Sequence, residues 1–189
     1  MRIRSVLIKR ILQQKSGLFG GLLILAFLGM AFAPMLFSPF DPLETHKAFR
    51  LEPPNSQFWF GTDELGRDIL SRIIWGCRIS LTTSFFTVVV ANFFGTFLGL
   101  VSGYYGGFRD NVIMRLMDIL FSFPFVILAI LIIAITGSGA VTVILCLSVA
   151  YLPYSARVAR GAVLSVKEIQ YVEAAKAAGG TDLRIILKH

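Results

Sequence analysis

The sequence predicts an all-α polytopic membrane protein, and three observations lead to this prediction. Of the 189 residues, 56% are hydrophobic and only 15% are charged, whereas about a quarter of the residues in a soluble domain are charged. The mean hydropathy is high, at +0.74. The apolar residues gather into long runs between charged segments, as in a chain that crosses a bilayer. This composition excludes a disordered chain and argues against a soluble enzyme, because too few polar side chains remain to cover the apolar ones.

Four apolar runs are long enough, or nearly long enough, to cross the hydrocarbon as helices. None of them contains Asp, Glu, Lys or Arg. We expect transmembrane helices at 18–37, 80–102, 119–136 and 140–156. The first run has a second interpretation, because basic residues precede it and residues 31–33 resemble a signal-peptidase site. Its length favours a retained anchor.

The distribution of basic residues predicts the orientation of these helices. The tail 1–17 carries five Lys and Arg, the connection 103–118 carries two, and the segment 157–189 carries six. The connection 38–79 carries five, together with six acidic residues. If the N-terminus is inside, thirteen basic residues face the cytoplasm and five face outward. The positive-inside rule therefore predicts a cytoplasmic N-terminal tail and a second cytoplasmic terminus.

Other classes of function find little support. The net charge is +7, but the basic residues lie between apolar runs rather than among stacking aromatics, so we expect no nucleic-acid partner. Cys77 and Cys146 belong to no CxxC motif or Cys/His cluster, and we expect neither a metal nor a cofactor. A membrane-embedded enzyme would need a nucleotide-binding motif or ionisable residues within the spans, and the sequence has neither. A structural scaffold in the membrane is the remaining alternative.

Small residues recur at every fourth position of the second predicted span. These are Ala91, Gly95, Gly99 and Gly103. On a helix they share one face, where small side chains let another helix approach closely. Ordinary helix packing is the favoured interpretation, and a transport pathway or subunit contact is the alternative.

The connection 38–79, an extracytoplasmic loop in this topology, is too long for a simple turn. Thr62 or Asp63 can cap a helix, and an apolar stripe follows between Ile69 and Cys77. We expect an amphipathic helix that lies at the membrane interface before the second span.

The segment 165–189 predicts two short cytoplasmic helices with a bend. Ser165–Glu168 fits a capping box, which would start the first helix. Gly179–Gly180 would end it, because glycine readily adopts the left-handed conformation of a helix C-terminus. Thr181 or Asp182 can cap the second helix.

Two motifs resemble those of ABC importer permeases. Glu173, Ala174 and Ala175, followed by Gly179, resemble the EAA loop of that family. The stretch from Phe60 to Arg72, followed by Gly-Cys-Arg-Ile-Ser-Leu, resembles the second (C-type) permease subunit of dipeptide, oligopeptide and nickel importers. The motif residues in this outer stretch are Gly61, Thr62, Asp63, Gly66, Arg67 and Asp68. The resemblance covers essentially the whole chain.

The resemblance implies a type I ABC importer permease fold in the bacterial inner membrane. It implies a non-catalytic transport subunit that works with a sister permease, two ABC ATPase subunits and an extracytoplasmic substrate-binding protein. Peptide is the favoured substrate and nickel the alternative. The EAA loop would dock on an ATPase subunit, with Glu173 contacting it and Gly179 providing the bend.

The resemblance also implies six transmembrane helices, of which four are present here. Residues 80–189 would then form an incomplete permease transmembrane domain. We expect a C-terminally shortened protein or a fragment.

Overall fold

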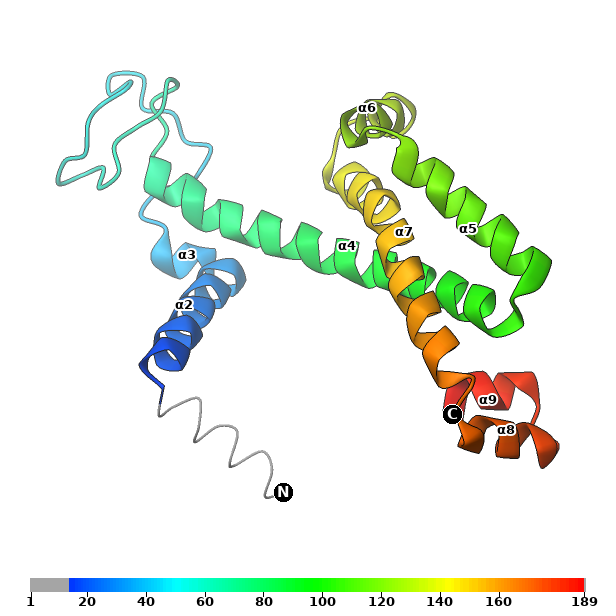
Figure 1. Ribbon diagram of the computed structural model, residues 1–189. Helices are drawn as coiled ribbons and strands as arrows, with labels where there is room; N and C mark the ends of the chain where they lie inside the picture. Colours follow the sequence, from blue (N-terminus) through cyan, green and yellow to red (C-terminus); the bar gives the residue numbers. More distant parts are fainter. Residues whose placement is uncertain (1–13, 189) are drawn as a thin grey trace. The chain divides into compact units, whose positions relative to one another are not determined.

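The computed structural model describes residues 14–188, except for the side chains of five residues in the last two helices, which are Glu173, Lys176, Leu183, Leu187 and Lys188. Most of the predicted N-terminal tail therefore lies outside the described residues. Helices dominate the described part of the chain and no strand occurs in it, which confirms the all-α prediction (Figure 1). The chain forms two compact units, Met1–Thr82 and Thr83–His189, and each is described by itself.

The first unit begins with two helices in place of the single helix predicted over 18–37. Helix α2 covers Lys15–Phe32 and the short α3 covers Pro34–Phe37. Ala33 separates them, with φ −131° and ψ 58°. Pro34 explains the break, because a proline disfavours helical geometry in the residue before it yet fits the first position of a new helix.

Helix α4, Ile69–Tyr105, unites the predicted amphipathic helix with the second predicted span. Two separate elements were expected because the residues change character near Cys77. No proline interrupts this stretch, so the backbone hydrogen bonds continue through the change. The helix also starts later than Thr62 or Asp63. Asp68 precedes its first residue, and the Asp68 carboxylate accepts a hydrogen bond from the Ser71 N–H at 2.8 Å.

A sharp bend replaces the straight third span predicted over 119–136. Helix α5 covers Gly107–Ser122 and α6 covers Phe125–Thr136, with 95° between them. Phe123 is extended, with ψ 130°, because Pro124 follows it. The prediction of a straight span overlooked this proline, which lies within an apolar run.

Helix α7, Ala140–Val166, is longer than the predicted span 140–156. It continues through the buried Pro153, since a proline inside a membrane helix is tolerated where neighbouring groups satisfy the freed backbone. The predicted capping box at Ser165 is corrected too, because Ser165 lies inside α7 and its hydroxyl donates to the Ala162 carbonyl at 2.8 Å. The next helix, α8, begins only at Gln170.

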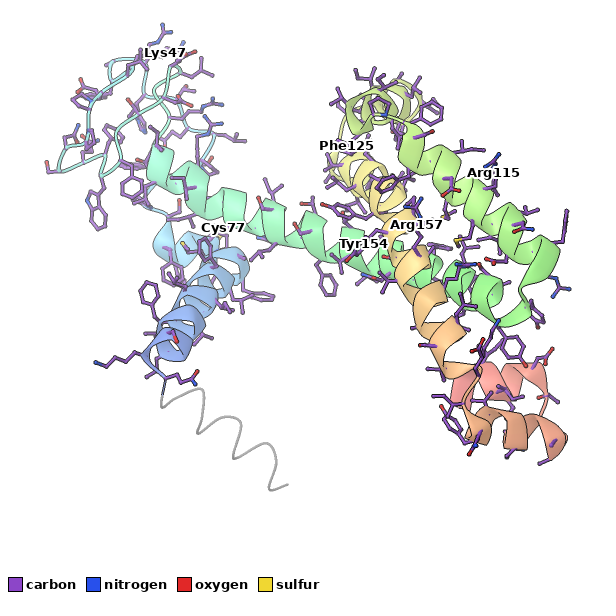
Figure 2. All side chains as sticks on the ribbon, in the orientation of Figure 1. Lys47, Cys77, Arg115, Phe125, Tyr154 and Arg157 are labelled. Carbon is purple, nitrogen blue, oxygen red and sulfur yellow. The ribbon has the colours of Figure 1, made fainter. Side chains whose placement is uncertain are left out.

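Three described helices, α2, α4 and α7, are long and apolar enough to cross a membrane, and the bent pair α5–α6 makes a fourth by length and composition. In the second unit α7 packs against both α5 and α6 (Figure 1). Arg157 extends from α7 toward α5, where it meets the Asp118 carboxylate at 2.7 Å and the Phe121 ring at 4.8 Å (Figure 2). Two short helices, α8 (Gln170–Ala177) and α9 (Asp182–Lys188), complete the described chain.

Candidate functional site

The outer segment, residues 38–68, folds around one buried phenylalanine. Phe58 has no exposed surface, and three rings surround it with centroids 5.3 to 5.7 Å away. These rings belong to Phe40, His46 and Phe49. The sequence analysis named none of these residues as a core, because the segment shows neither helical nor strand periodicity.

Two motif glycines hold this segment in conformations that other residues reach only at a cost. Gly61 has φ +74° and Gly66 has φ +76°. A Cβ on Gly61 would lie 2.4 Å from the Glu52 carbonyl oxygen, and one on Gly66 would lie 2.3 Å from that of His46. Both positions therefore exclude a side chain by backbone conformation and by space.

Thr62 and Asp63 tie the segment together through backbone groups. The Thr62 Oγ1 accepts from the Glu52 N–H at 2.9 Å and donates to the Phe49 carbonyl. The Asp63 carboxylate accepts from the backbone N–H of Leu65 at 2.8 Å and of Arg67 at 3.0 Å. Asp63 thus closes the turn that contains Gly66, and Thr62 ties that turn to the Phe49–Glu52 stretch.

Two arginines complete the surroundings of Asp63. The Arg67 Nε lies 2.8 Å from its Oδ2, and the Arg72 guanidinium donates to the same oxygen. Burial acts to raise the pKa of the Asp63 carboxyl. The hydrogen bonds from Arg67 and Leu65 and the Arg67 charge outweigh it and lower the pKa to about 2.

Asp68 joins the outer segment to the first turn of α4. It is 1% exposed, and its Oδ2 accepts from the Ser71 hydroxyl at 2.6 Å as well as from the Ser71 N–H. The Ser71 hydroxyl in turn accepts from the Phe40 N–H at 3.1 Å. All six residues of the outer motif therefore have a part in folding this segment.

The small residues of α4 face α7 within the second unit. A Cβ on Gly95 would lie 2.5 Å from the Ser155 Cβ, and one on Gly99 would lie 2.4 Å from the Ala156 carbonyl oxygen. A Cβ on Gly103 would lie 2.9 Å from the Val163 Cβ. Ala91, the first of the four, is 2% exposed. The backbones of α4 and α7 thus approach too closely for larger side chains along this seam.

Polar groups also cross the seam, and the sequence analysis missed them. The Ser155 hydroxyl lies 3.0 Å from the Asn92 Oδ1, and the Ser148 hydroxyl lies 3.4 Å from the Thr87 carbonyl oxygen. The two serines are seven residues apart, so they share a face of α7. That spacing within an apolar helix is the signal that could have identified them.

Helices α8 and α9 form a hairpin whose turn is closed by backbone hydrogen bonds. The Gly180 N–H donates to the Ala175 carbonyl at 3.0 Å, and the Ala178 N–H donates to the Ala174 carbonyl at 2.9 Å. Gly179 between them has φ +81°. This is a Schellman-type helix end, in which glycine supplies the left-handed residue.

The hairpin exposes the motif residues instead of enclosing them. Ala174 and Gly179 are exposed, and a Cβ on Gly179 would meet no atom within 4 Å. Ala175 is half-buried, and the side chain of Glu173 lies outside the described residues. Gly179 is thus required for its conformation alone, and the surface around it is open.

The family model for "binding-protein-dependent transport system inner membrane component" matches residues 95–189. The chain belongs to this inner-membrane component family. The match begins at Gly95, so it includes the glycines of the α4–α7 seam and the whole α8–α9 hairpin.

Curated relatives extend the similarity to the outer segment. The chain is 41% identical to the glutathione transport system permease protein GsiD of Pectobacterium atrosepticum and to the dipeptide transport system permease protein DppC of Alkalihalophilus pseudofirmus. Each match covers 96% of this chain and 60% of the relative. It is 38% identical to the dipeptide permease DppC of Haemophilus influenzae, over 92% of this chain and 61% of that relative. The chain thus spans about three fifths of the length of these relatives.

Within the family-matched region, an ion pair joins α5 to α7. The Arg160 guanidinium contacts both carboxylate oxygens of Asp110, at 2.7 and 2.6 Å, and the Ser102 hydroxyl donates to the same carboxylate. Sequence analysis assigned both charges to connections, because it ended the apolar runs before them. Their partnership depends on how α5 and α7 of this inner-membrane component pack.

Proposed function

We propose that this chain is the membrane-spanning permease subunit of an ATP-driven ABC importer for peptides. Membership in the inner-membrane component family supports the transport role, and the names of the relatives support a peptide or glutathione substrate in preference to nickel. The subunit itself is non-catalytic, and ATP hydrolysis takes place on two partner ATPase subunits. A sister permease and an extracytoplasmic binding protein complete the assembly.

The observation that carries this proposal is the open surface of the α8–α9 hairpin. Alanines and an exposed left-handed glycine give a slim surface, and no described side chain lies within 4 Å of a Cβ placed on Gly179. Such a surface fits into a groove on another subunit. The hairpin is therefore the docking element for an ATPase subunit, with Glu173, Ala174, Ala175 and Gly179 as the contact region.

The proposed orientation places both termini and the hairpin in the cytoplasm. Thirteen basic residues then face inward and five outward. The outer segment 38–68 faces the binding protein on the opposite side of the membrane. The small residues of the α4–α7 seam serve packing within this chain.

Two substitutions in the full-length permease test the docking role. Glu173→Lys reverses a charge that would be desolvated at the interface, where removing one member of a pair costs about 2–5 kcal/mol. Gly179→Val forces a β-branched residue into a left-handed conformation, at a cost of about 1–2 kcal/mol, and misdirects α9. Both should lower recovery of the ATPase subunit in co-purification at least about tenfold, while membrane insertion stays normal.

Matched variants separate docking from general damage. Glu168→Lys makes the same charge change at an exposed position in the turn before α8, and it should leave ATPase recovery unchanged. Gly179→Asn should retain much of the recovery, because asparagine tolerates the left-handed conformation. Full recovery with both Glu173→Lys and Gly179→Val would contradict the docking role of the hairpin.

A further inference from the structure

The last turn of α4 contacts three successive parts of the second unit through three consecutive residues. Ser102 contacts Asp110 of α5, Gly103 contacts Lys167 after α7, and Tyr104 contacts Asp182 of α9. We call residues 102–104 the α4 hub. The hub is where the contacts of α5, α7 and the α8–α9 hairpin meet.

Two of these contacts hold the hairpin. The Tyr104 hydroxyl donates to the Asp182 Oδ1 at 2.6 Å, at the first residue of α9. The Lys167 ammonium donates to the Gly103 carbonyl at 3.1 Å, in the turn that leads from α7 into α8. That carbonyl is one of the last four of α4, which find no partner within the helix and attract a cation. The hairpin is thus tied to α4 on both sides of α8.

The third contact fixes α5 and α7 at the same place. The Asp110 carboxylate accepts from the Ser102 hydroxyl and from two nitrogens of Arg160. A bidentate pair of this kind has a defined geometry as well as a favourable energy. Asp110 lies in the first turn of α5 and Arg160 lies in α7, so the pair joins two helices to the end of a third.

Apolar packing of the hairpin is incomplete. Val172 of α8 and Ile185 of α9 are buried, at 2% and 3% exposed. Beside them lies a partly open pocket of about 280 Å³, lined by apolar side chains of α4, α7, α8 and α9 together with Thr96, Tyr104 and Lys167. Atoms that line a void lose dispersion contacts on one side. The polar contacts of the hub therefore supplement the apolar packing in positioning the hairpin.

We propose that the α4 hub transmits the position of the α8–α9 hairpin to α4, α5 and α7, with Tyr104 and Asp182 as positioning residues. The inference rests on the proposed docking of an ATPase subunit on the hairpin. Movement of that subunit displaces α9, and the hydrogen bond from Tyr104 carries the displacement to the end of α4. The ion pair of Asp110 and Arg160 makes the ends of α5 and α7 follow.

The test compares uptake with ATPase recovery in the assembled, full-length transporter. Tyr104→Phe removes only the hydroxyl, and it should lower uptake of labelled dipeptides or glutathione about fivefold per ATP hydrolysed, with ATPase recovery unchanged. Tyr105→Phe is the matched control, because the Tyr105 ring packs against the Arg109 guanidinium, at 4.4 Å. Asp182→Ala should resemble Tyr104→Phe. Asp182→Asn keeps an acceptor oxygen and should retain most of the uptake.

A cross-link tests whether Tyr104 and Asp182 stay in contact during transport. Tyr104→Cys and Asp182→Cys, combined with Cys77→Ser and Cys146→Ser, provide two thiols for a short bifunctional reagent. Linking them should restore uptake to the double-cysteine protein.

Three results would overturn the proposal. One is normal uptake by Tyr104→Phe, and another is a cross-link that blocks uptake. The third is loss of ATPase recovery in Tyr104→Phe, which would assign the hydroxyl to docking. Failure of the docking role itself would appear separately, as normal ATPase recovery with Glu173→Lys and Gly179→Val.

Discussion

The outer segment 38–68 and the α8–α9 hairpin each contain a motif identified in the sequence, but the two motifs lie in opposite surroundings. In the outer segment Thr62 and Asp68 are 3% and 1% exposed, and a Cβ on Gly61 or Gly66 would collide with backbone. In the hairpin Ala174 and Gly179 are exposed. The residues of the outer motif are needed for this chain to fold, whereas residues of the hairpin motif remain exposed to solvent or to another molecule.

Glycine is required in this chain for two reasons, which act together or separately. Gly66 needs both a left-handed backbone and empty space. Gly179 needs only the backbone conformation, and Gly99 needs only the space. A motif therefore has to be interpreted by what surrounds each residue before it is assigned to binding.

The largest expected difference between the two regions is their side of the membrane. With Cys77→Ser and Cys146→Ser, a thiol at Ser56→Cys should react fully with an impermeant reagent on intact cells, and one at Glu168→Cys should react only after permeabilisation. Ser56 is a better position than Asn55, because the Asn55 Oδ1 accepts from the N–H groups of Gln57 and Phe58. Equal labelling of both on intact cells would contradict the proposed topology.

Next in size is the effect of filling the seam. Gly99→Leu should lower the free energy of unfolding by more than about 3 kcal/mol, because the new side chain would meet α7 backbone. Leu98→Ala, at the neighbouring half-buried position, should cost no more than about 2 kcal/mol. Thermal unfolding in detergent can be followed by the reactivity of the buried Cys146 with a thiol dye, in a Cys77→Ser background. Equal costs would mean that the close approach is unimportant for stability.

A smaller effect is expected from adding a methyl group to Gly66 or Gly179, one glycine of each region with a left-handed backbone. Gly66→Ala should destabilise its region by about 3 kcal/mol, from backbone strain together with the clash against the His46 carbonyl. Gly179→Ala has open space around it and should cost about 1 kcal/mol. Hydrogen exchange at the amides of His46 and Gly180 measures the two effects, since the His46 N–H donates to the Gly66 carbonyl and the Gly180 N–H to the Ala175 carbonyl. A larger increase in exchange rate at Gly180 in Gly179→Ala than at His46 in Gly66→Ala would contradict this expectation.

The last expected difference between the two regions is an acid sensitivity of the outer segment. The pKa of Asp63 is about 2 in the folded segment and near 3.8 without its partners. Its stabilisation is therefore complete above about pH 4 and is lost as the pH falls toward 2, with a magnitude on the order of 2 kcal/mol.

Asp63→Asn should remove this pH dependence from the exchange rates of the Leu65 and Arg67 amides. Asp41→Asn is the control, because Asp41 forms a similar turn through the Leu43 N–H. An unchanged pH profile in Asp63→Asn would show that another carboxyl is responsible.

The sequence by itself determined the class of the molecule and much of its local chemistry. Composition and the apolar runs predicted an all-α membrane protein, because burial in lipid demands that composition whatever the helices contact. The break of the hairpin at Gly179 was also predictable, because it depends on a local property of glycine. The predicted face of small residues on α4 required only the helical repeat.

Only the tertiary structure decided where the helices end and which groups meet. The bend at Pro124 and the passage of α7 through Pro153 come from the same residue type, and the outcome depends on whether neighbouring groups satisfy the freed backbone. The pairing of Asp110 with Arg160 joins residues fifty positions apart. The contact between Tyr104 and Asp182 joins residues 78 positions apart. Such pairs depend on how the helices pack. Hydrophobic periodicity shows which face of a helix is buried, but it does not show which residues will meet.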